Sequence, residues 1–321
     1  MSRSLRNKLV RWAQRTIARG SKSFVLASRF LPRRERENAW LLYAWCRTCD
    51  DVTDGQDLGH GSFEAPGAAI DLWAMTRRAV RSEDDVPLPF AALREARRDA
   101  GLPLHYLEDH LRGFALDKQG WRPTDCMELE GYCYHVAGAV GGLMAVTLGI
   151  ECHDEDTLSR ASDLGIAFQL NNIARDLIED ARIGRCYLPG DWLARGGFAE
   201  QAIAEPENRA GLAKFARDLN RLARRYDASG RIGATRLPWR SRLAILVAAN
   251  VYGEIGAKVV RRGIGAWDDR TATNGAEKLA GVLHAFAQLN AAPEPTTRKG
   301  LFCREAWYAA NRIGSAAQLS L

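Results

Sequence analysis

Helical periodicity runs through almost all of this 321-residue chain. Apolar residues recur at the three- and four-residue spacing of an amphipathic helix, and alternating runs of β-branched residues bounded by turns are nearly absent. Glycine- and proline-containing breakers separate the periodic segments. These segments cover roughly residues 4–19, 34–54, 68–82, 88–100, 103–117, 124–148, 154–182, 208–228, 237–263 and 275–290. The pattern predicts an all-α protein.

The chain shows no boundary between two differently composed halves, so we expect one helical domain. The stretch from residue 291 onward, which opens with AAPEPTTRKG, is expected to form a loosely held tail. No window of about 18 apolar residues indicates a membrane-spanning helix. The basic start lacks the apolar core and the cleavage site of a secretory signal.

The segment YAWCRTCDDVTDGQ (43–56) places three aspartates within five residues near the end of a predicted helix. Asp50 and Asp54 are four residues apart and therefore share one helix face, which Arg47 and Tyr43 extend toward the N-terminus. A like-charge pair at this spacing is unfavourable unless something compensates for it. A divalent cation does so, because carboxylates one turn apart can bind Mg²⁺ and leave coordination positions for water and phosphate oxygens.

A second acidic stripe occurs in FQLNNIARDLIEDARIGRCYLP (168–189). Asn172, Asp176 and Asp180 step by four residues, and Gln169 lies one turn before them. Each stripe on its own is typical of a solvated helix face. Two such stripes, each near an arginine and each on an apolar helix, favour a shared metal site instead. If they face one another across a bundle, the bound ions would hold a diphosphate and stabilise it as a leaving group.

The formal net charge of +6 and the isoelectric point near 9.0 favour an anionic partner. Phosphorylated substrates, acidic lipid headgroups and nucleic acid all fit that charge. Nucleic acid is disfavoured, because the basic residues are dispersed and lack an aromatic stripe. Seven scattered cysteines do not resemble a disulfide framework and favour a reducing cytoplasm. Cys46 and Cys49 have no second CxxC, so we expect them to pack as small hydrophobes.

Four motifs resemble the squalene/phytoene synthase family: SKSF (21–24), YAWCRTCDDVTD (43–54), YCYHVAGAVG (132–141) and FQLNNIARDLIEDARIGRCYLP (168–189). The resemblance is greatest to the bacterial, phytoene-forming members. It covers about residues 12–290, which we take as the synthase domain, with a basic extension at 1–11 and the tail at 291–321 outside it. It implies an isoprenoid synthase fold, a single helical bundle around a central active-site cavity.

This family joins two prenyl diphosphates head to head. The resemblance implies that two geranylgeranyl diphosphates condense to phytoene through prephytoene diphosphate, with release of two diphosphates, in carotenoid biosynthesis. It also implies several Mg²⁺ or Mn²⁺ ions per site. The absence of a dinucleotide fingerprint around GAVGG favours the reaction without NADPH, although reductive members of the family bind NADPH without one.

The resemblance also assigns roles to individual residues. Metal binding is implied for Asp50, Asp54, Asn172, Asp176 and Asp180, and the four aspartates are thereby part of the catalytic set. Contacts with diphosphate or with the metal cluster are implied for Ser21, Ser23, Arg47, Gln169, Arg175, Tyr252 and Arg270. Aromatic or hydroxyl groups near the reacting carbons are implied at Tyr43, Tyr134 and Tyr187.

Two segments each leave two interpretations open. The small residues of HVAGAVGGLMAVTLG (135–149) would either leave room for a polyprenyl tail or allow close helix packing. The basic N-terminal helix, with Leu5, Leu9 and Trp12 on one face, would either rest on the anionic inner face of the cell membrane or pack on the bundle. For His135, beside the small residues, a hydrogen-bonded structural role is favoured over that of a base.

Two other functions remain as alternatives. A squalene, presqualene or dehydrosqualene synthase that acts on farnesyl diphosphate would share every metal residue. A non-catalytic prenyl-lipid-binding or assembly protein could keep the fold, but a site that no longer worked would be expected to lose its unfavourable like-charge pairs. The sequence leaves the oligomeric state open.

Overall fold

The computed structural model describes residues 3–55, 71–82, 84–197 and 199–310, and every regular element within these ranges is a helix. The first half contains α1 (Arg3–Gly20), α2 (Lys22–Ser28), α3 (Arg33–Asp54), α4 (Leu72–Arg81), α5 (Leu88–Ala100), α6 (Leu104–Lys118), α7 (Cys126–Cys133), the π-helix η1 (Tyr134–Gly138) and α8 (Ala139–Thr147). The second half contains α9 (Glu155–Arg182), α10 (Gly190–Gly196), the short 3₁₀-helices η2 (Glu200–Ala202) and η3 (Pro206–Asn208), α11 (Arg209–Ala234), α12 (Trp239–Arg262), η4 (Gly263–Trp267), α13 (Gly275–Gln288) and α14 (Arg304–Ala310). The all-α prediction is confirmed.

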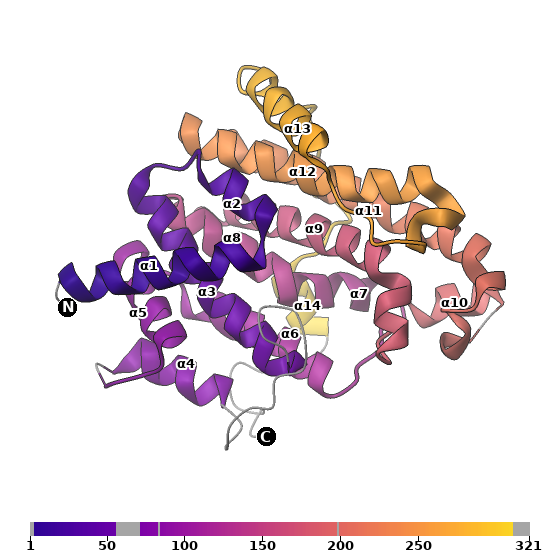
Figure 1. Cartoon of the computed structure of the whole chain (residues 1–321), viewed down its shortest axis with the longest axis horizontal. Helices are drawn as coiled ribbons and strands as arrows, with labels where there is room; N and C mark the ends of the chain where they lie inside the picture. Colours follow the sequence, from indigo (N-terminus) through magenta and orange to yellow (C-terminus); the bar gives the residue numbers. More distant parts are fainter. Residues whose placement is uncertain (1–2, 56–70, 83, 198, 311–321) are drawn as a thin grey trace.

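Helix α9 is the central element of the bundle and packs against η1, α8, α11 and α12 (Figure 1). It begins at Glu155 because Asp154 caps it, with the carboxylate accepting from the Thr157 N–H at 3.1 Å. The apolar stripe predicted from the sequence, Leu170, Ile173 and Leu177, is buried. The helix therefore presents one side to the core and leaves its polar stripe free to face another part of the bundle.

Helix α3 ends directly behind its aspartates. Gly55 adopts a left-handed backbone with φ of 62°, and its N–H bonds to the Asp51 carbonyl, which closes the helix. Asp50 and Asp54 therefore sit at the carbonyl end of α3. Asp176 and Asp180 occupy the equivalent place on α9, which ends at Arg182.

The predicted helix over 124–148 is interrupted by a single π-helical turn, η1, between α7 and α8. Its small residues allow close helix packing, and several of them also line a cavity. A Cβ on Gly141 would lie 2.2 Å from the Ala161 carbonyl oxygen, so the glycine allows α8 to approach α9 closely. Ala137, Gly141 and Ala145 also line the central cavity.

Helix α1 packs on the bundle through Leu9, Ala13 and Ile17, which are almost completely buried. Of the face predicted from the sequence, Leu9 is buried, Trp12 is half-buried and Leu5 is 40% exposed. The segment Trp239–Trp267 is long and apolar enough to cross a membrane, which the search for apolar windows in the sequence did not find. More than half of its most apolar window is buried inside the molecule. Its burial is that of a core helix of the bundle.

The C-terminal segment from Arg298 to Tyr308, which we expected to be held loosely, is bonded to the core. Arg298 donates two hydrogen bonds to the fully buried carboxylate of Asp163, at 2.7 and 2.9 Å. Arg304 donates at 2.6 Å to Asp109, which is also fully buried. Neither acidic residue stands out in the sequence as the partner of a tail. This part of the chain is therefore integral to the bundle.

We predict that Arg298→Met lowers the free energy of unfolding by about 3–5 kcal/mol, because it leaves the buried Asp163 carboxylate without its cation. Urea unfolding followed by circular dichroism would measure the loss. Arg221→Met is the matched control: Arg221 forms an exposed pair with Asp218 and should cost less than about 1 kcal/mol. Equal losses in the two variants would show that the Arg298–Asp163 pair is not an anchor.

Candidate active site

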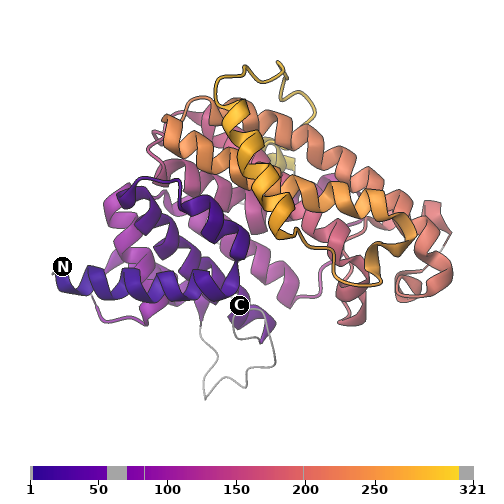
Figure 2. The same ribbon diagram turned by 45° about the horizontal axis from the view of Figure 1, so that its top comes forward.

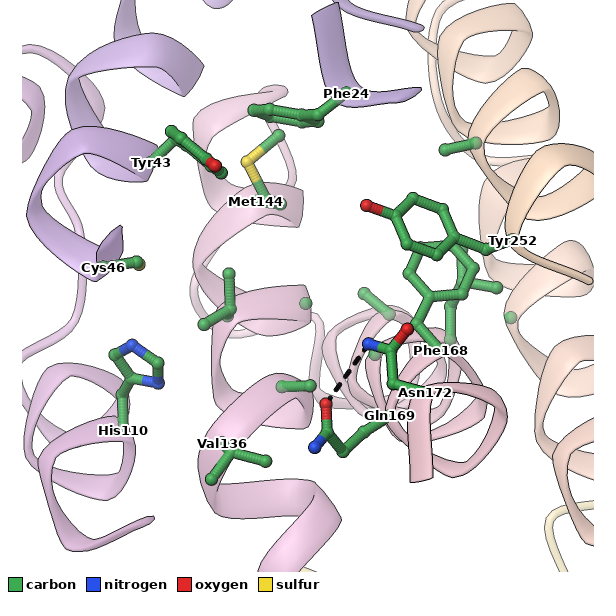
Figure 3. A pocket seen from close by; sticks show the side chains of 18 of the residues that line it. Phe24, Tyr43, Cys46, His110, Val136, Met144, Phe168, Gln169, Asn172 and Tyr252 are labelled. Atoms are coloured by element: carbon green, nitrogen blue, oxygen red, sulfur yellow. Dashed lines mark hydrogen bonds between the residues drawn. The ribbon is translucent and has the colours of Figure 1, made fainter. Parts of the chain in front are cut away.

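A cavity of about 500 Å³ lies at the centre of the bundle, between α2, α3, α6, α8, α9, α11 and α12 (Figure 3). Its lining changes character along the helices. On α9 it passes from Ala161, Leu164 and Phe168 to Asn172 and Asp180. At 1.5 Å per residue, Ala161 and Asp180 are roughly 28 Å apart along the helix axis. The cavity is therefore long, with an apolar end and a polar end.

At the polar end, the acidic residues of α3 are each paired with an arginine. Arg47 lies 2.9 Å from the Asp50 carboxylate and 2.6 Å from that of Asp51. Asp54 accepts a hydrogen bond of 2.5 Å from Arg185, which follows α9. Arg185 was not among the residues predicted from the sequence, although it lies within the motif that contains Asp180. The arginine that pairs with the acidic end of α3 thus comes from the segment that follows α9.

The acidic residues of α9 form the opposite wall. The carboxylate of Asp176 accepts from Arg175 at 2.7 Å and from Arg270 at 3.2 Å, which brings the loop of residues 267–270 (WDDR) to the site. Asn172 donates to Gln169 at 3.5 Å, and both line the cavity (Figure 3). Asp180 also lines the cavity, and among the described residues its carboxylate makes no hydrogen bond or ion pair.

Position and burial make these carboxylates electrostatically unfavourable. They occupy the C-terminal ends of α3 and α9, where the helix macrodipole repels negative charge. Burial, with Asp54 adding repulsion, raises the pKa of Asp50 to about 6. Burial and the neighbouring Asp176 raise the pKa of Asp180 to about 7. The site is therefore short of positive charge despite its arginines.

The donor set fits a hard divalent cation, since carboxylate and amide oxygens are the ligands that Mg²⁺ prefers. Within the described ranges, no three His, Cys, Asp or Glu side chains are close enough to hold a metal ion by themselves. The protein alone does not complete a coordination shell. Water and the oxygens of a ligand would have to supply the remaining positions, which is how Mg²⁺ is usually bound beside phosphates.

Tyr132 and Asp117 belong to the polar end and were missed in the sequence. The hydroxyls of Tyr132 and Tyr187 both donate to Asp117, each at 2.9 Å. The two rings stack with centroids 4.8 Å apart, and Trp121 stacks on the outer face of Tyr132. All but Trp121 line the cavity. Two tyrosines on separate segments are thereby held against one carboxylate, whose pKa is raised by burial.

Tyr134, the tyrosine singled out from the sequence, lies away from the cavity lining. Its hydroxyl donates to the buried Asp109 at 2.7 Å, and its ring stacks on Phe302. The four-residue spacing of a helix face would have indicated Tyr132, and not Tyr134, as the tyrosine that lines the cavity. Tyr132 begins the series that continues through Val136, Val140 and Met144, all of which line the cavity.

Residues of α2 and α12 close the cavity opposite α3. Ser21 caps α2, accepting from the Phe24 N–H at 3.2 Å, and its hydroxyl lies 3.5 Å from that of Tyr252. Tyr252 stacks on Phe168 with ring centroids 4.6 Å apart, and the ring centroids of Phe24 and Tyr43 are 5.4 Å apart. Ser23 lies half-buried in the first turn of α2. These contacts bring the SKSF motif to the cavity.

The histidines and cysteines near the site have mainly structural surroundings. His135 is buried, and its Nδ1 lies 3.1 Å from the Asp109 carbonyl oxygen, as expected for a hydrogen-bonded core histidine. His110 lines the cavity, and burial lowers its pKa to about 4, so it is neutral. Cys46 and Cys49 are free thiols packed among apolar residues.

The predicted residues fall into three groups. Those that line the cavity are Tyr43, Arg47, Asp50, Gln169, Asn172, Asp180, Tyr187 and Tyr252. Those bonded to one another or to a lining residue at its edge are Ser21, Asp54, Arg175, Asp176 and Arg270. Ser23 lies beside the lining residue Phe24, and Tyr134 points into the core instead.

We predict that Asp180→Asn stabilises the metal-free protein at about pH 8 while adding little at about pH 4. A carboxyl whose pKa is raised on folding is penalised as pH rises from its ordinary value of 3.8 toward about 7, and the amide removes that penalty. Thermal unfolding in EDTA at the two pH values would measure it. Asp218→Asn, at an exposed carboxylate on α11 outside the cavity, is the matched control.

Comparisons with known proteins identify relatives of this chain. A family model described as squalene/phytoene synthase matches residues 17–275. The 15-cis-phytoene synthase of Enterobacter agglomerans is 44% identical over 274 residues, which is 84% of this chain and 92% of that protein. The 15-cis-phytoene synthase of Pantoea ananas is 43% identical over 288 residues, 87% of this chain and 92% of that one.

Solved structures share the fold. The crystal structure of a dehydrosqualene synthase in complex with ligand superposes with a TM-score of 0.79 at 25% identity, covering 89% of this chain and 98% of that one. The squalene synthase HpnC from Alicyclobacillus acidocaldarius gives a TM-score of 0.70 at 23% identity, covering 82% and 97%.

Proposed function

The chain belongs to the squalene/phytoene synthase family, and we propose that it is a phytoene synthase that condenses two geranylgeranyl diphosphates head to head. The first half-reaction releases one diphosphate and forms the cyclopropyl intermediate prephytoene diphosphate. The second releases the other diphosphate and one proton and yields phytoene. The bacterial relatives at 42–44% identity over 84–87% of this chain are phytoene synthases by name.

The observation that carries this proposal is the pairing of two acidic helix ends at the polar end of an otherwise apolar cavity. An allylic diphosphate has the complementary shape, with a compact anionic head and a long hydrocarbon tail. The apolar lining from Ala161 to Phe168 would hold the tail and keep water from the carbocation that forms when diphosphate leaves. The polar end would hold the head.

The metal-binding set we propose is Asp50, Asp54, Asn172, Asp176 and Asp180, with Mg²⁺ or Mn²⁺ as the cation. Bound there, divalent ions would neutralise diphosphate charge and so stabilise it as a leaving group. The oxygen donors and the raised pKa values of Asp50 and Asp180 support this assignment, because both indicate missing positive charge. No NADPH is needed for the phytoene-forming reaction.

The arginines at the polar end have a proposed role of their own. Arg47, Arg175, Arg185 and Arg270 already contact the acidic residues, so each is held within reach of a diphosphate bound between them. A guanidinium matches the geometry of phosphate oxygens and forms paired hydrogen bonds with them. These residues would bind and orient the departing diphosphates.

Aromatic rings surround the region where carbon–carbon bonds would form. Phe24, Tyr43, Tyr132, Phe168 and Tyr252 line the cavity near the change from apolar to polar lining. The face of an aromatic ring attracts a cation, and the attraction is stronger away from water. We propose that these rings stabilise the carbocations, while Asp117 keeps Tyr132 and Tyr187 in a fixed orientation.

The main enzymatic alternative is a C30 synthase that uses farnesyl diphosphate. Squalene and dehydrosqualene synthases are among the structural neighbours, but at 25% identity or less they speak mainly for the shared fold. The relatives named as phytoene synthases are much more similar in sequence. We therefore propose geranylgeranyl diphosphate as the substrate and keep farnesyl diphosphate for the test.

We predict that the purified protein converts geranylgeranyl diphosphate and Mg²⁺ to a C40 hydrocarbon without NADPH. Hydrocarbon extraction and mass spectrometry would identify the product, with EDTA as the metal control. Asp176→Asn should reduce turnover at least about a hundredfold, because it removes a charge placed for the metal–diphosphate cluster. Asp218→Asn, on the surface of α11, should be as active as the unmodified protein.

The other outcomes of this assay have distinct meanings. Product from farnesyl diphosphate alone would move the protein to the C30 branch and leave the mechanism intact. Binding of geranylgeranyl diphosphate without turnover would favour a non-catalytic lipid-binding protein. Near-normal activity of Asp176→Asn would refute the metal assignment.

Two neighbouring tyrosines offer a second test. Tyr132→Phe should lower kcat by about tenfold or more, because Tyr132 lines the cavity. Tyr134→Phe should leave kcat nearly unchanged, although both variants remove a donor from a buried carboxylate and should each lower the free energy of unfolding by about 1–3 kcal/mol. Steady-state kinetics and urea unfolding of both variants would check this. The opposite assignment of effects would place Tyr134 at the reacting carbons.

A further inference from the structure

Helix α13 lies on the outer edge of the molecule, across α12 (Figures 1 and 2). Its inner side is buried, with Gly281 and Ala285 packed toward α12 and α2. Its outer side is also apolar: Leu279, Leu283 and Phe286 are 59%, 62% and 47% exposed. Between residues 279 and 287 no side chain carries a formal charge, and His284 is the only polar one.

This composition is unusual for the surface of a soluble bundle, where the outer side of a helix is normally charged or polar. The exposed residues follow a helical stripe at spacings of four and three, so they form one continuous surface and not scattered exceptions. Single exposed apolar side chains are ordinary, but a contiguous patch marks an interaction site. Five of the ten large apolar side chains that are exposed in the described residues lie between positions 239 and 286.

An aromatic and basic group flanks this patch. Trp239, at the start of α12, is 64% exposed, and Arg240 lies over its ring at 5.8 Å. The Arg240 guanidinium donates to the carbonyl of Phe30, whose ring packs edge-on against Phe286 at 6.1 Å. Exposed tryptophan beside arginine is the composition found at the boundary between lipid and water.

Two arginines beside the patch have no carboxylate partner among the described residues. Arg240 bonds to a backbone carbonyl, and Arg29, exposed next to Phe30, forms no ion pair among the described residues. A second copy of this chain is a poor occupant of the patch, because a twofold contact would bring like charges from the two copies together. An anionic lipid surface would complement both the apolar stripe and the charges.

The patch is also continuous with the wall of the cavity. One apolar cluster contains Phe168 and Ala248, which line the cavity, together with Val282 and Ala285 of α13 and Leu26 and Phe30 of α2. The exposed stripe is the outer surface of the same helix. No charged layer therefore separates the apolar wall of the cavity from the patch.

We propose that the outer side of α13, with Trp239 and Arg240, is the surface by which this protein docks on a membrane that contains anionic lipid. Leu279, Leu283 and Phe286 enter the interfacial region, Trp239 lies at the level of the headgroups, and Arg29 and Arg240 contact their phosphates. Of the predicted apolar face of α1, Leu9 is buried in the bundle and Leu5 is 40% exposed, so α1 offers a smaller apolar surface than α13 does. The link to a prenyl substrate and a hydrocarbon product rests on the proposed function, whereas the docking itself does not.

The test is vesicle co-sedimentation of the full chain without substrate. Vesicles of phosphatidylcholine with phosphatidylglycerol are compared with vesicles of phosphatidylcholine alone. We expect Leu279→Gln/Leu283→Gln to weaken binding to the anionic vesicles about tenfold, because binding scales with the apolar area inserted. Leu279→Ala/Leu283→Ala, which keeps a strong helix former, should act in the same direction.

The matched control is Leu88→Gln/Met127→Gln, two apolar residues that are 50% and 52% exposed on other helices. It should bind as the unmodified protein does. Arg240→Gln should weaken binding to anionic vesicles only. Unchanged binding of the α13 variants, or no binding of the unmodified protein, would overturn the proposal. So would a change in solution mass of the α13 variants on light scattering, which would assign the patch to a second copy of the chain.

Activity on detergent-dispersed geranylgeranyl diphosphate separates this proposal from the proposed function. The α13 variants should keep their turnover in detergent, since none of the substituted residues lines the cavity. A protein that binds vesicles through α13 but makes no hydrocarbon would leave the docking surface intact and remove the proposed reaction.

Discussion

Negative charge at the wrong ends of two helices is the constraint around which this structure is organised. Asp50 and Asp54 close α3, and Asp176 and Asp180 lie in the last turns of α9, so both pairs face the negative pole of their own helix. Arg47, Arg175, Arg185 and Arg270 offset part of that charge, and two of the four come from the chain after α9. Asp180 keeps no such partner among the described residues. Carboxylates at the C-terminal ends of helices lower stability, so their presence at the ends of α3 and α9 indicates a cationic ligand.

Much of this site could be predicted because helical spacing translates directly into geometry. Asp50 with Asp54, and Asn172 with Asp176 and Asp180, are close in the structure for the same reason that they share a face in the sequence. The apolar stripe of Leu170, Ile173 and Leu177 likewise turned inward as its period required. Local periodicity was sufficient wherever one helix supplied the whole feature.

Features that depend on contacts between distant segments were not predicted. Asp117 is a single carboxylate on α6 and gains its place only when Tyr132 and Tyr187 reach it from elsewhere. Tyr132 and Tyr134 are two residues apart, and which of them faces the cavity depends on the register of α7 and on the π-helical turn that follows it. The segment after residue 291 was expected to be loose because its composition is that of a linker, and its partners Asp109 and Asp163 lie more than 130 residues earlier. In each case a contact between segments far apart in the sequence decides where the residue lies.

The arginine anchors of the C-terminal segment have a consequence for how this protein is made. Synthesis delivers α6 and α9 long before Arg298 and Arg304 emerge, and domains tend to fold as the nascent chain appears. Until then Asp163 lacks the cation that accompanies its burial, and Asp109 has only Arg112 of its own helix, so α9 in particular has an electrostatic reason not to be covered tightly at Asp163. Final compaction of the core around η1 is thus tied to the arrival of the last helix. A chain cut short by an early stop would be left with an open interior that quality-control proteases can recognise.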